Sequence, residues 1–354
     1  MKKNDPLNMV ANAVKNSVLN GTANKASPPP QAPSEPSPPA FKVSEGKQAF
    51  SNLFRLANAK RDHDVTVFKA KDWNESIRDL IPEVNPNYVW QPEIEAFHVA
   101  IEKGEPILIT GPTGCGKSTM VEQYGAITQR PFVRINMRGD IETSSLLGMQ
   151  QAKNGQTYWS DGSLTQAVKE GGIALIDEYD FTPPEIMYSI QWLLEDNPKL
   201  LLTDKSDKVI DMMVKAHPDF RIVFAGNTKG QGDMTGEFPG AQVQSMATVD
   251  RCKTTLHMGY LPEVQERAII KGSVPSITSD MLDKIMQLVG ILRTSYSQCH
   301  LSVGVSPRTE VSFAEKWLYW NDPKYAFDLS FGNKLEETER KPANDIFHRV
   351  FGSV

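Results

Sequence analysis

A glycine-rich segment is the first part of the sequence whose residues could do chemistry. The residues GPTGCGKST follow the apolar run PILIT and precede the helix-like run MVEQYGAIT. The pattern G-x-x-x-x-G-K-[ST] in that context is typical of a loop whose backbone N–H groups point at phosphate oxygens while the next helix presents its positive end. We expect Lys117 to reach the β- and γ-phosphates of ATP and Ser118 to coordinate Mg2+. The predicted nucleotide-binding residues of this loop are Gly111, Pro112, Thr113, Gly114, Cys115, Gly116, Lys117, Ser118 and Thr119.

A pair of adjacent carboxylates is the second such feature. The segment GGIALIDEYD places Asp177 and Glu178 where an apolar, strand-like run ends. Burying two negative charges there costs free energy unless a cation is present. We therefore expect Asp177 to bind Mg2+, directly or through water, and Glu178 to orient and activate the water that attacks the γ-phosphate. The alternative is an exposed acidic turn without a ligand.

A polar residue also ends a later apolar run. Asn227 follows RIVFAG, and an asparagine after a strand is commonly a turn former. Ligands of parallel sheets bind at the carboxyl ends of the strands, where Asp177 and Glu178 are also expected. We therefore predict that the Asn227 amide lies beside the two carboxylates and polarises the catalytic water.

Two arginines are candidates for contact with phosphate. Arg308 lies in VSPRTE, where Ser306 is the expected N-cap and Pro307 the first helical residue. A cation in a first helical turn opposes the helix dipole by about a few tenths of a kcal/mol, which indicates that a phosphate supplies the missing negative charge. An ordinary surface arginine is the alternative. Arg251, in MATVDRCKTTL, is by itself more simply interpreted as a structural or solvated arginine.

The elements that must position these residues follow from the apolar runs. Short runs alternate with helical patterns, which predicts an α/β fold with a parallel five-stranded sheet between helices. After Leu261 the pattern is helical and predicts a small α-helical lid domain. The expected strands are PILIT (106–110), FVRIN (132–136), IALI (173–176), RIVFAG (221–226) and TTLHM (254–258).

Composition divides the chain further. Residues 26–40 are rich in proline and read as an extended linker. Residues 1–25 contain a stripe of apolar positions, so this segment is either a docking peptide or a disordered tail. We expect an N-terminal lead-in over residues 41–90, the α/β ATPase core over residues 91–260, and the helical lid with a C-terminal segment over residues 261–354.

The bulk properties exclude several classes of protein. The 354 residues carry a formal net charge of -5 and contain no apolar run near the length that spans a bilayer, about 20 residues, nor a signal-peptide core. We therefore expect a cytoplasmic protein without a membrane partner. The three cysteines, at wide and irregular spacing, fit reduced thiols better than a disulfide framework or a zinc site. Long basic runs are absent, which disfavours general nucleic-acid binding but leaves room for a local basic pore.

Several longer segments together resemble the MoxR-like, dynein-related AAA+ ATPases, and within them the CobS type of aerobic cobaltochelatase subunit. The resemblance covers most of residues 80–310, whereas residues 1–79, with the Pro-rich leader, and 311–354 show little of it. The segments that carry it are NPNYVWQP, GPTGCGKST, FVRINMRGDIETSSLLG, LIDEYDFTPPEIMYSIQWLLE, AHPDFRIVFAGNTKGQGDMTGEFPG and VDRCKTTLHMGYLP.

The resemblance implies a homo-oligomeric ring, six subunits in the family, with nucleotide at each subunit boundary. Arg251 would then be an arginine finger that reaches a neighbour's γ-phosphate, and Arg308 would act either within its own subunit or across the boundary. Two inserted hairpins are also implied, around residues 144–164 and 200–211. Their composition agrees, since Asn154-Gly155 is a tight-turn signal and LLLTDKSDKVID alternates around a polar tip.

The resemblance bears on the partner as well. Chelatase motors of this type act with a subunit that carries a von Willebrand factor A (VWA) domain, and this chain has no D-x-S-x-S motif of that domain. We therefore expect an ATP-hydrolysing motor that remodels or loads a protein partner, with a VWA subunit as the candidate. Two alternatives stay open at this point, a DNA-associated motor and a nucleotide-gated assembly scaffold with slow hydrolysis.

Overall fold

Residues 46–56, 60–61, 63–137, 142–232 and 240–352 are the part of the chain that this computed structural model describes. They all belong to one unit of the chain, residues 41–354. The predicted docking peptide and the Pro-rich linker lie outside the described residues.

A five-stranded parallel sheet forms the centre of the α/β part, with the strand order β11-β3-β10-β7-β4. Its strands are the five apolar runs of the sequence, and each observed end lies within one residue of the expected one. The predicted α/β fold with a five-stranded parallel sheet is confirmed. The strands are β3 (Ile107–Thr110), β4 (Phe132–Asn136), β7 (Gly172–Asp177), β10 (Phe220–Gly226) and β11 (Thr254–His257).

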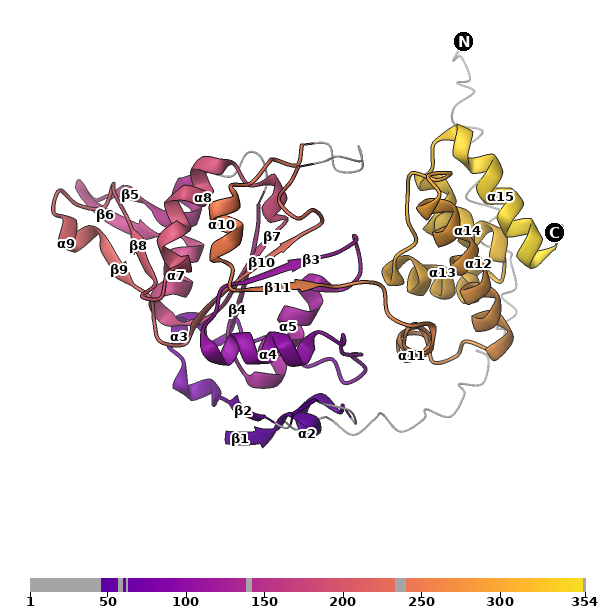
Figure 1. The fold of residues 1–354 in the computed structure, drawn as a ribbon, viewed down its shortest axis with the longest axis horizontal. Coiled ribbons are helices and arrows are strands. Elements are labelled where there is room, and N and C mark those ends of the chain that lie inside the picture. The colour runs from indigo at the N-terminus through magenta and orange to yellow at the C-terminus, as the bar shows by residue number, and fades with distance from the viewer. Residues whose placement is uncertain (1–45, 57–59, 62, 138–141, 233–239, 353–354) are drawn as a thin grey trace, which may run out of the picture. The chain divides into compact units, whose positions relative to one another are not determined.

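Helices cover both faces of this sheet (Figure 1), so the strands are apolar on both sides. Successive residues of β3 face opposite cores: Ile107 and Ile109 pack with α4 and α5, whereas Leu108 packs with α7 and α8. The helices and short 3-10 turns of this part are α4 (Ile94–Lys103), α5 (Lys117–Thr128), α6 (Thr143–Leu147), α7 (Ser163–Glu170), η2 (Tyr179–Phe181), α8 (Pro184–Ile190), η3 (Gln191–Leu194) and α10 (Met246–Arg251).

The lead-in segment is part of the core rather than a plain connection. Phe54 lies 4.8 Å from the Trp90 ring and 5.8 Å from the Tyr124 ring, both between centroids, and Phe50 is fully buried beside them. This segment therefore packs on α5, the helix that begins with Lys117. Its elements are β1 (Gly46–Ala49), α2 (Phe50–Phe54), β2 (Asp64–Val67), η1 (Ala70–Asp72) and α3 (Glu75–Arg78), with β1 and β2 antiparallel.

The first predicted hairpin is present between α6 and α7. Strands β5 (Gly148–Lys153) and β6 (Gln156–Asp161) pair antiparallel. Asn154 and Gly155 form the turn with φ of 55° and 77°, the left-handed values that favour these two residue types.

The second hairpin differs from the prediction over residues 200–211. The paired strands are the short β8 (Lys199–Leu201) and β9 (Met213–Lys215), and the segment expected to be the second strand contains the helical turn α9 (Val209–Met212). The reason is local hydrogen bonding: the N–H groups of Asp211 and Met212 both donate to the Lys208 carbonyl oxygen, at 2.9 and 3.2 Å, which closes a helical turn.

The helical part after residue 261 has its own apolar core, centred on Leu288, Phe313 and Phe347. None of the described helices combines the length and apolar character that crossing a bilayer requires. The elements of this helical part are α11 (Glu263–Ser273), α12 (Ser279–Ser297), α13 (Pro307–Trp320), α14 (Pro323–Ser330), η4 (Gly332–Lys334) and α15 (Glu337–Phe351).

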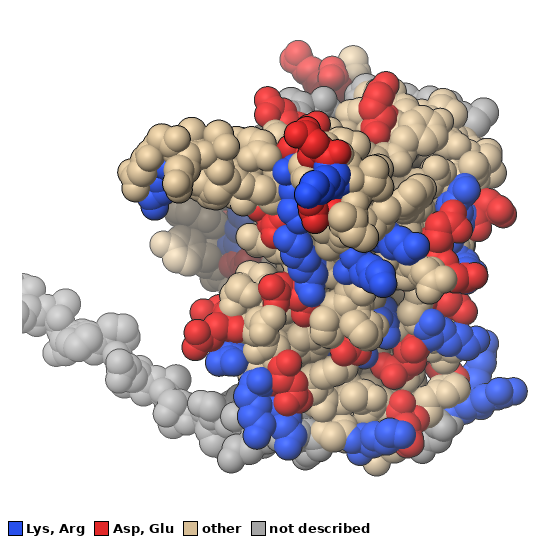
Figure 2. Space-filling model, turned by 90° about the vertical axis from the view of Figure 1, so that its left-hand side faces the viewer, with Lys and Arg blue, Asp and Glu red and all other residues tan. Residues whose placement is uncertain are grey.

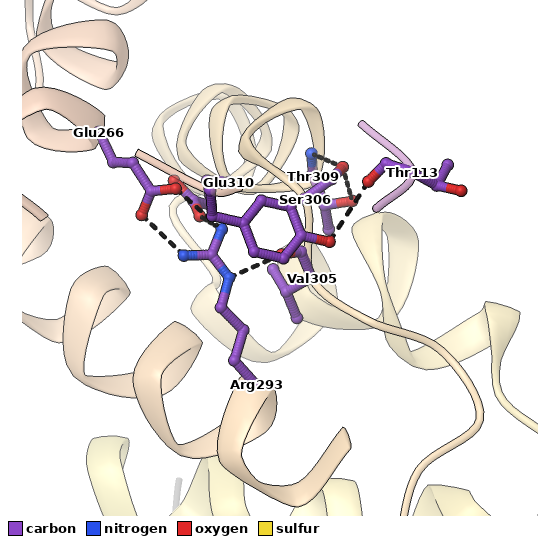
Figure 3. A network of polar contacts seen from close by, with 8 residues as sticks. Thr113, Glu266, Arg293, Val305, Ser306, Thr309 and Glu310 are labelled. Carbon is purple, nitrogen blue, oxygen red and sulfur yellow. Dashed lines mark hydrogen bonds and ion pairs between the residues drawn. The ribbon is translucent and has the colours of Figure 1, made fainter. Parts of the chain in front are cut away.

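One arginine joins three segments of the lid (Figure 3). The guanidinium of Arg293, on α12, donates to both carboxylate oxygens of Glu266 on α11, at 2.7 and 3.0 Å. It also donates to Glu310 on α13, at 2.6 Å, and to the Val305 carbonyl oxygen, at 2.9 Å. Because both carboxyl groups are buried, removal of Arg293 would leave the Glu266 charge without compensation and both groups without their hydrogen-bond donor.

The two carboxyl groups share this single cation, and Glu310 is the less well compensated of the two. Its Oε2 atom is buried and has no hydrogen-bond partner among the described residues. Burial and the nearby Glu266 carboxylate raise the pKa of Glu310 from 4.5 to about 8, against the opposing effect of Arg293. Glu310 therefore holds a proton in the folded chain at pH values where the unfolded chain has released it.

We expect this proton to make stability fall as pH rises. Between the unfolded pKa of 4.5 and the folded pKa of about 8, the native state binds the extra proton, so the free energy of unfolding decreases with increasing pH. Glu310→Gln should remove this contribution and give a flatter pH dependence from pH 5 to 8 in urea unfolding followed by circular dichroism. Parallel profiles for the two proteins would contradict the assignment.

Candidate nucleotide-binding site

The phosphate loop connects the end of β3 to the start of α5, and its conformation requires glycine. Gly111 has φ of 154° and Gly114 has φ of 77°. A Cβ atom on Gly114 would lie 2.4 Å from the Cβ atom of Ser306, and one on Gly111 would lie 2.0 Å from the Met258 carbonyl oxygen. The loop is therefore closely enclosed by the lid on one side and by the segment after β11 on the other.

Lys117 and Asn227 meet at this loop, although 110 positions separate them in the sequence. The Lys117 ammonium donates to the Asn227 Oδ1 atom at 2.9 Å and to the carbonyl oxygens of Gly111 and Pro112 at 2.7 and 3.0 Å. The lysine is 8 % exposed, and burial lowers its pKa while the nearby acidic groups oppose that shift. A phosphate group in the loop would give the Lys117 ammonium an anionic partner in place of these neutral oxygens.

Ser118 and Asp177 also meet. The Ser118 hydroxyl donates to the Asp177 Oδ2 atom at 2.7 Å, and Asp177 is 4 % exposed. A hydroxyl and a carboxylate are hard oxygen ligands of the kind that Mg2+ prefers, so these two residues fit a magnesium ion.

Arg134 is a member of the site that the sequence analysis missed. This residue of β4 donates from Nε to the Asp177 Oδ2 atom at 2.7 Å, and its Nη2 atom forms an ion pair with the same oxygen at 2.6 Å. The contact depends on the pairing of β4 with β7, which puts Asn136 opposite Asp177. The signal in the sequence was a charged residue inside the otherwise mostly apolar run FVRIN.

Glu178 lies beside these groups with its side chain exposed, and it adopts left-handed backbone angles of φ 57° and ψ 40°. Such a conformation costs on the order of 1–3 kcal/mol for a residue other than glycine. Two contacts hold it: the Glu178 N–H donates to the Asp177 Oδ1 atom at 3.1 Å, and the Phe181 N–H donates to the Glu178 carbonyl oxygen at 2.9 Å. The turn thereby directs the Glu178 carboxylate away from the apolar strand.

Asp180 is a second residue that the sequence analysis left without a role. It is fully buried and accepts hydrogen bonds from the backbone N–H groups of Asn227 and Thr228, at 2.5 and 3.1 Å, and from the Thr228 hydroxyl at 2.7 Å. Asp180 thus fixes the turn after β10 that presents Asn227 to Lys117.

The lid places Arg308 at the same site. The Ser306 Oγ atom accepts from the Thr309 N–H at 3.4 Å, and Pro307 is the first residue of α13, as predicted for this helix start. Tyr260 adds a second connection, because its hydroxyl donates to the Thr113 carbonyl oxygen at 3.3 Å while the Arg293 guanidinium lies 4.1 Å from its ring centroid.

Two cavities flank the phosphate loop, and Arg308 lines both. The larger, of about 770 Å³, lies on the side of Asn227. The smaller, of about 550 Å³, extends from Gly116 to a mainly apolar wall and could hold the base of a nucleotide. Part of this wall comes from the segment NPNYVWQP, whose sequence alone did not predict a cavity. Its lining includes Asn85, Tyr88, Val89, Leu261 and Ile269.

Arg251 is the predicted site residue that the structure does not bring to the loop. It ends α10 and donates to the Glu195 Oε1 atom at 2.8 Å and to the Ala247 carbonyl oxygen at 2.7 Å. Its side chain is half-buried near the protein surface, where Glu195 is exposed.

Comparison with known proteins agrees with this arrangement. The family profile described as "AAA domain (dynein-related subfamily)" matches residues 106–245, which span the phosphate loop, both carboxylates and Asn227. The aerobic cobaltochelatase subunit CobS of Sinorhizobium sp is 31 % identical over 281 residues, 77 % of this chain and 83 % of that protein.

Two further relatives have other names. Protein NorQ of Paracoccus denitrificans is 33 % identical over 62 % of this chain and 76 % of its own length. The von Willebrand factor A domain-containing protein 8 of Mus musculus is 27 % identical over 60 % of this chain but only 11 % of its own length. With the parallel sheet, the phosphate loop and the helical lid, these similarities show that the chain belongs to the MoxR-like, dynein-related AAA+ ATPases, the family of CobS and NorQ.

Proposed function

We propose that this chain hydrolyses ATP as a subunit of a ring-shaped motor that remodels or loads a protein partner. The observation that supports it best is the set of contacts among Lys117, Ser118, Asp177 and Asn227, which join three different strand ends at one phosphate loop. In this proposal the adenine base occupies the smaller cavity, and the triphosphate lies along the loop toward Asn227.

Each residue has a distinct task in the proposed reaction. Lys117 exchanges its loop carbonyl partners for phosphate oxygens, and Asn227 gains a free amide that can hold the attacking water. Glu178 accepts a proton from that water, and the oxygen then attacks the γ-phosphorus as the bond to the ADP oxygen breaks. Ser118 and Asp177 would hold Mg2+, which neutralises charge on the β- and γ-phosphates.

The remaining cation comes from a neighbouring subunit in this proposal. The Arg251 guanidinium contacts Glu195 and the Ala247 carbonyl oxygen rather than the phosphate loop of its own chain, and it is half-buried at the end of α10, a position open to a second copy. Arg308 supplies the lid's contact with phosphate. We propose a homohexamer, in which Arg251 of one subunit reaches the γ-phosphate of the next.

The proposed partner is a protein with a VWA domain. One relative supports this choice by its name, a VWA domain-containing protein, and another is named as a subunit of a cobaltochelatase, which fits a motor that acts with other subunits. The inserted hairpins offer a surface for contact, since Tyr158, Val209 and Ile210 are exposed on them. Gln150 of the first hairpin donates to carbonyl oxygens of the second, at 3.2 and 3.1 Å, so the two hairpins form one surface.

Two substitutions separate binding from hydrolysis. Lys117→Ala should lose nucleotide binding, because it removes the ammonium group that contacts the phosphate oxygens in the proposed complex. Glu178→Gln should bind ATP with an affinity close to wild type and reduce turnover by at least ~100-fold, since general-base catalysis contributes roughly 10²–10⁴. Fluorescent-nucleotide titration and phosphate release measure the two properties. Equal ATP affinity in Lys117→Ala and wild type would refute the assignment of the loop.

Mixing variants tests whether Arg251 acts between subunits. Arg251→Ala should retain ATP binding and lose about 10³–10⁵ in turnover, the range for arginine fingers. Adding Lys117→Ala subunits, which retain the arginine, should partly restore phosphate release. Lys253→Ala is the matched control, because Lys253 pairs with Asp196 at the same surface and should leave turnover near wild type. Absence of recovery in rings that contain both variants would exclude action across the boundary.

The partner can be identified by capture from native cells with the ATP-bound Glu178→Gln protein as bait and Lys117→Ala as the control. We expect a VWA-domain protein, identified by mass spectrometry, to be retained by the first bait and not by the second. Retention of DNA together with DNA-stimulated turnover would instead support a DNA-associated motor.

A further inference from the structure

We propose that Arg134 is a positioning residue that occupies the cation position at Asp177 and must leave it when Mg2+ binds, so that Arg134 sets the Mg2+ concentration at which the site loads. This inference rests on the proposed nucleotide site, and it assigns a role to a residue outside every predicted motif.

The Asp177 Oδ2 atom is already saturated. It accepts hydrogen bonds from the Ser118 hydroxyl and from Arg134 Nε, both at 2.7 Å, and Arg134 Nη2 lies 2.6 Å from it as an ion-pair partner. A carboxylate oxygen offers about two lone-pair positions. The other oxygen, Oδ1, accepts from the Glu178 N–H at 3.1 Å. A metal ion that binds Asp177 through Oδ2 therefore displaces the guanidinium.

Burial explains why some cation is needed. Asp177 is 4 % exposed at the end of a strand whose residues are all buried, and a carboxylate in such a place is costly without an opposite charge. Lys117 lies nearby, but the structure gives its ammonium only to neutral oxygens. Arg134 thus provides the direct ion pair of Asp177.

Arg134 is also able to leave. Its side chain is 51 % exposed, and β4 is the edge strand of the sheet, so the guanidinium can return to water without opening the core. Across the described residues, Asp177 is its only ion-pair partner. When Arg134 is released, its charge-assisted contacts with Asp177 are lost. The free energy of those contacts therefore weakens the binding of the metal to the site.

The test measures metal binding rather than turnover. Arg134→Met in the full chain should lower the free Mg2+ concentration for half-maximal binding of a fluorescent ATP analogue by roughly tenfold, the order of magnitude for one competing charged contact. Binding of the same analogue in EDTA should not change. Mn2+ titration without nucleotide, followed by electron paramagnetic resonance, should show the same gain in metal affinity.

Two variants serve as controls. Lys169→Met breaks the ion pair with Asp161 and changes the net charge equally, but outside the site, and should leave the Mg2+ curve in place. Arg134→Lys keeps a cation with a single point of contact and should give an intermediate shift, which also serves if Arg134→Met does not fold.

The outcomes are distinct. A Mg2+ curve that is unchanged or moves to higher concentration in both Arg134 variants overturns the inference. Weaker binding in EDTA would mean that Arg134 contacts phosphate, and this also overturns it. If wild type binds no ATP analogue at all, the proposed function fails, but a tighter Mn2+ site in Arg134→Met would still support competition at Asp177.

Discussion

The compensation of the buried Asp177 charge is the interaction on which the site depends. Asp177 ends β7, and the groups that surround it come from α5, β4 and the turn after β7. The register of the sheet makes this possible, because Asn136 and Ala225 both lie opposite Asp177 on the neighbouring strands. A slip of one residue in either pair would change which side chains face the carboxylate.

The lid meets the same constraint, with one arginine for two buried carboxyl groups. There a single Arg293 lies between two buried carboxylates, and the stacking of that arginine on Tyr260 connects it to the phosphate loop. The Asp177 cluster lies at the carboxyl edge of the sheet, and the Arg293 cluster lies near the start of α13, which carries Arg308. The Tyr260 contact with Thr113 links the second cluster to the phosphate loop.

The sequence predicted the strands closely because each is an apolar run between turn-forming residues, and it predicted the phosphate loop because that motif is contiguous. Arg134 and Asp180 escaped prediction for the opposite reason. Both act through the pairing of strands and turns that are distant in the chain, and nothing in FVRIN or LIDEYD names their partners. The wall of the smaller cavity has the same origin, since residues near 88 and near 265 meet only after folding.

The error at the second hairpin has a different cause. The alternation in LLLTDKSDKVID is compatible with a strand, but the N–H groups of Asp211 and Met212 both donate to the Lys208 carbonyl oxygen, which closes a helical turn where the second strand was expected. The helical turn is favoured there because the paired strands are only three residues long and form few hydrogen bonds with each other.

The close approach of Gly114 to Ser306 gives the phosphate loop a second property besides binding phosphate. The space between Gly114 and Ser306 leaves no room for even a methyl group, so the phosphate loop is in direct contact with the lid. Any side chain there would act as a spacer and hold Arg308 farther from the loop, whatever its effect on the nucleotide. Glycine at this position therefore determines how closely the lid can approach the phosphate loop.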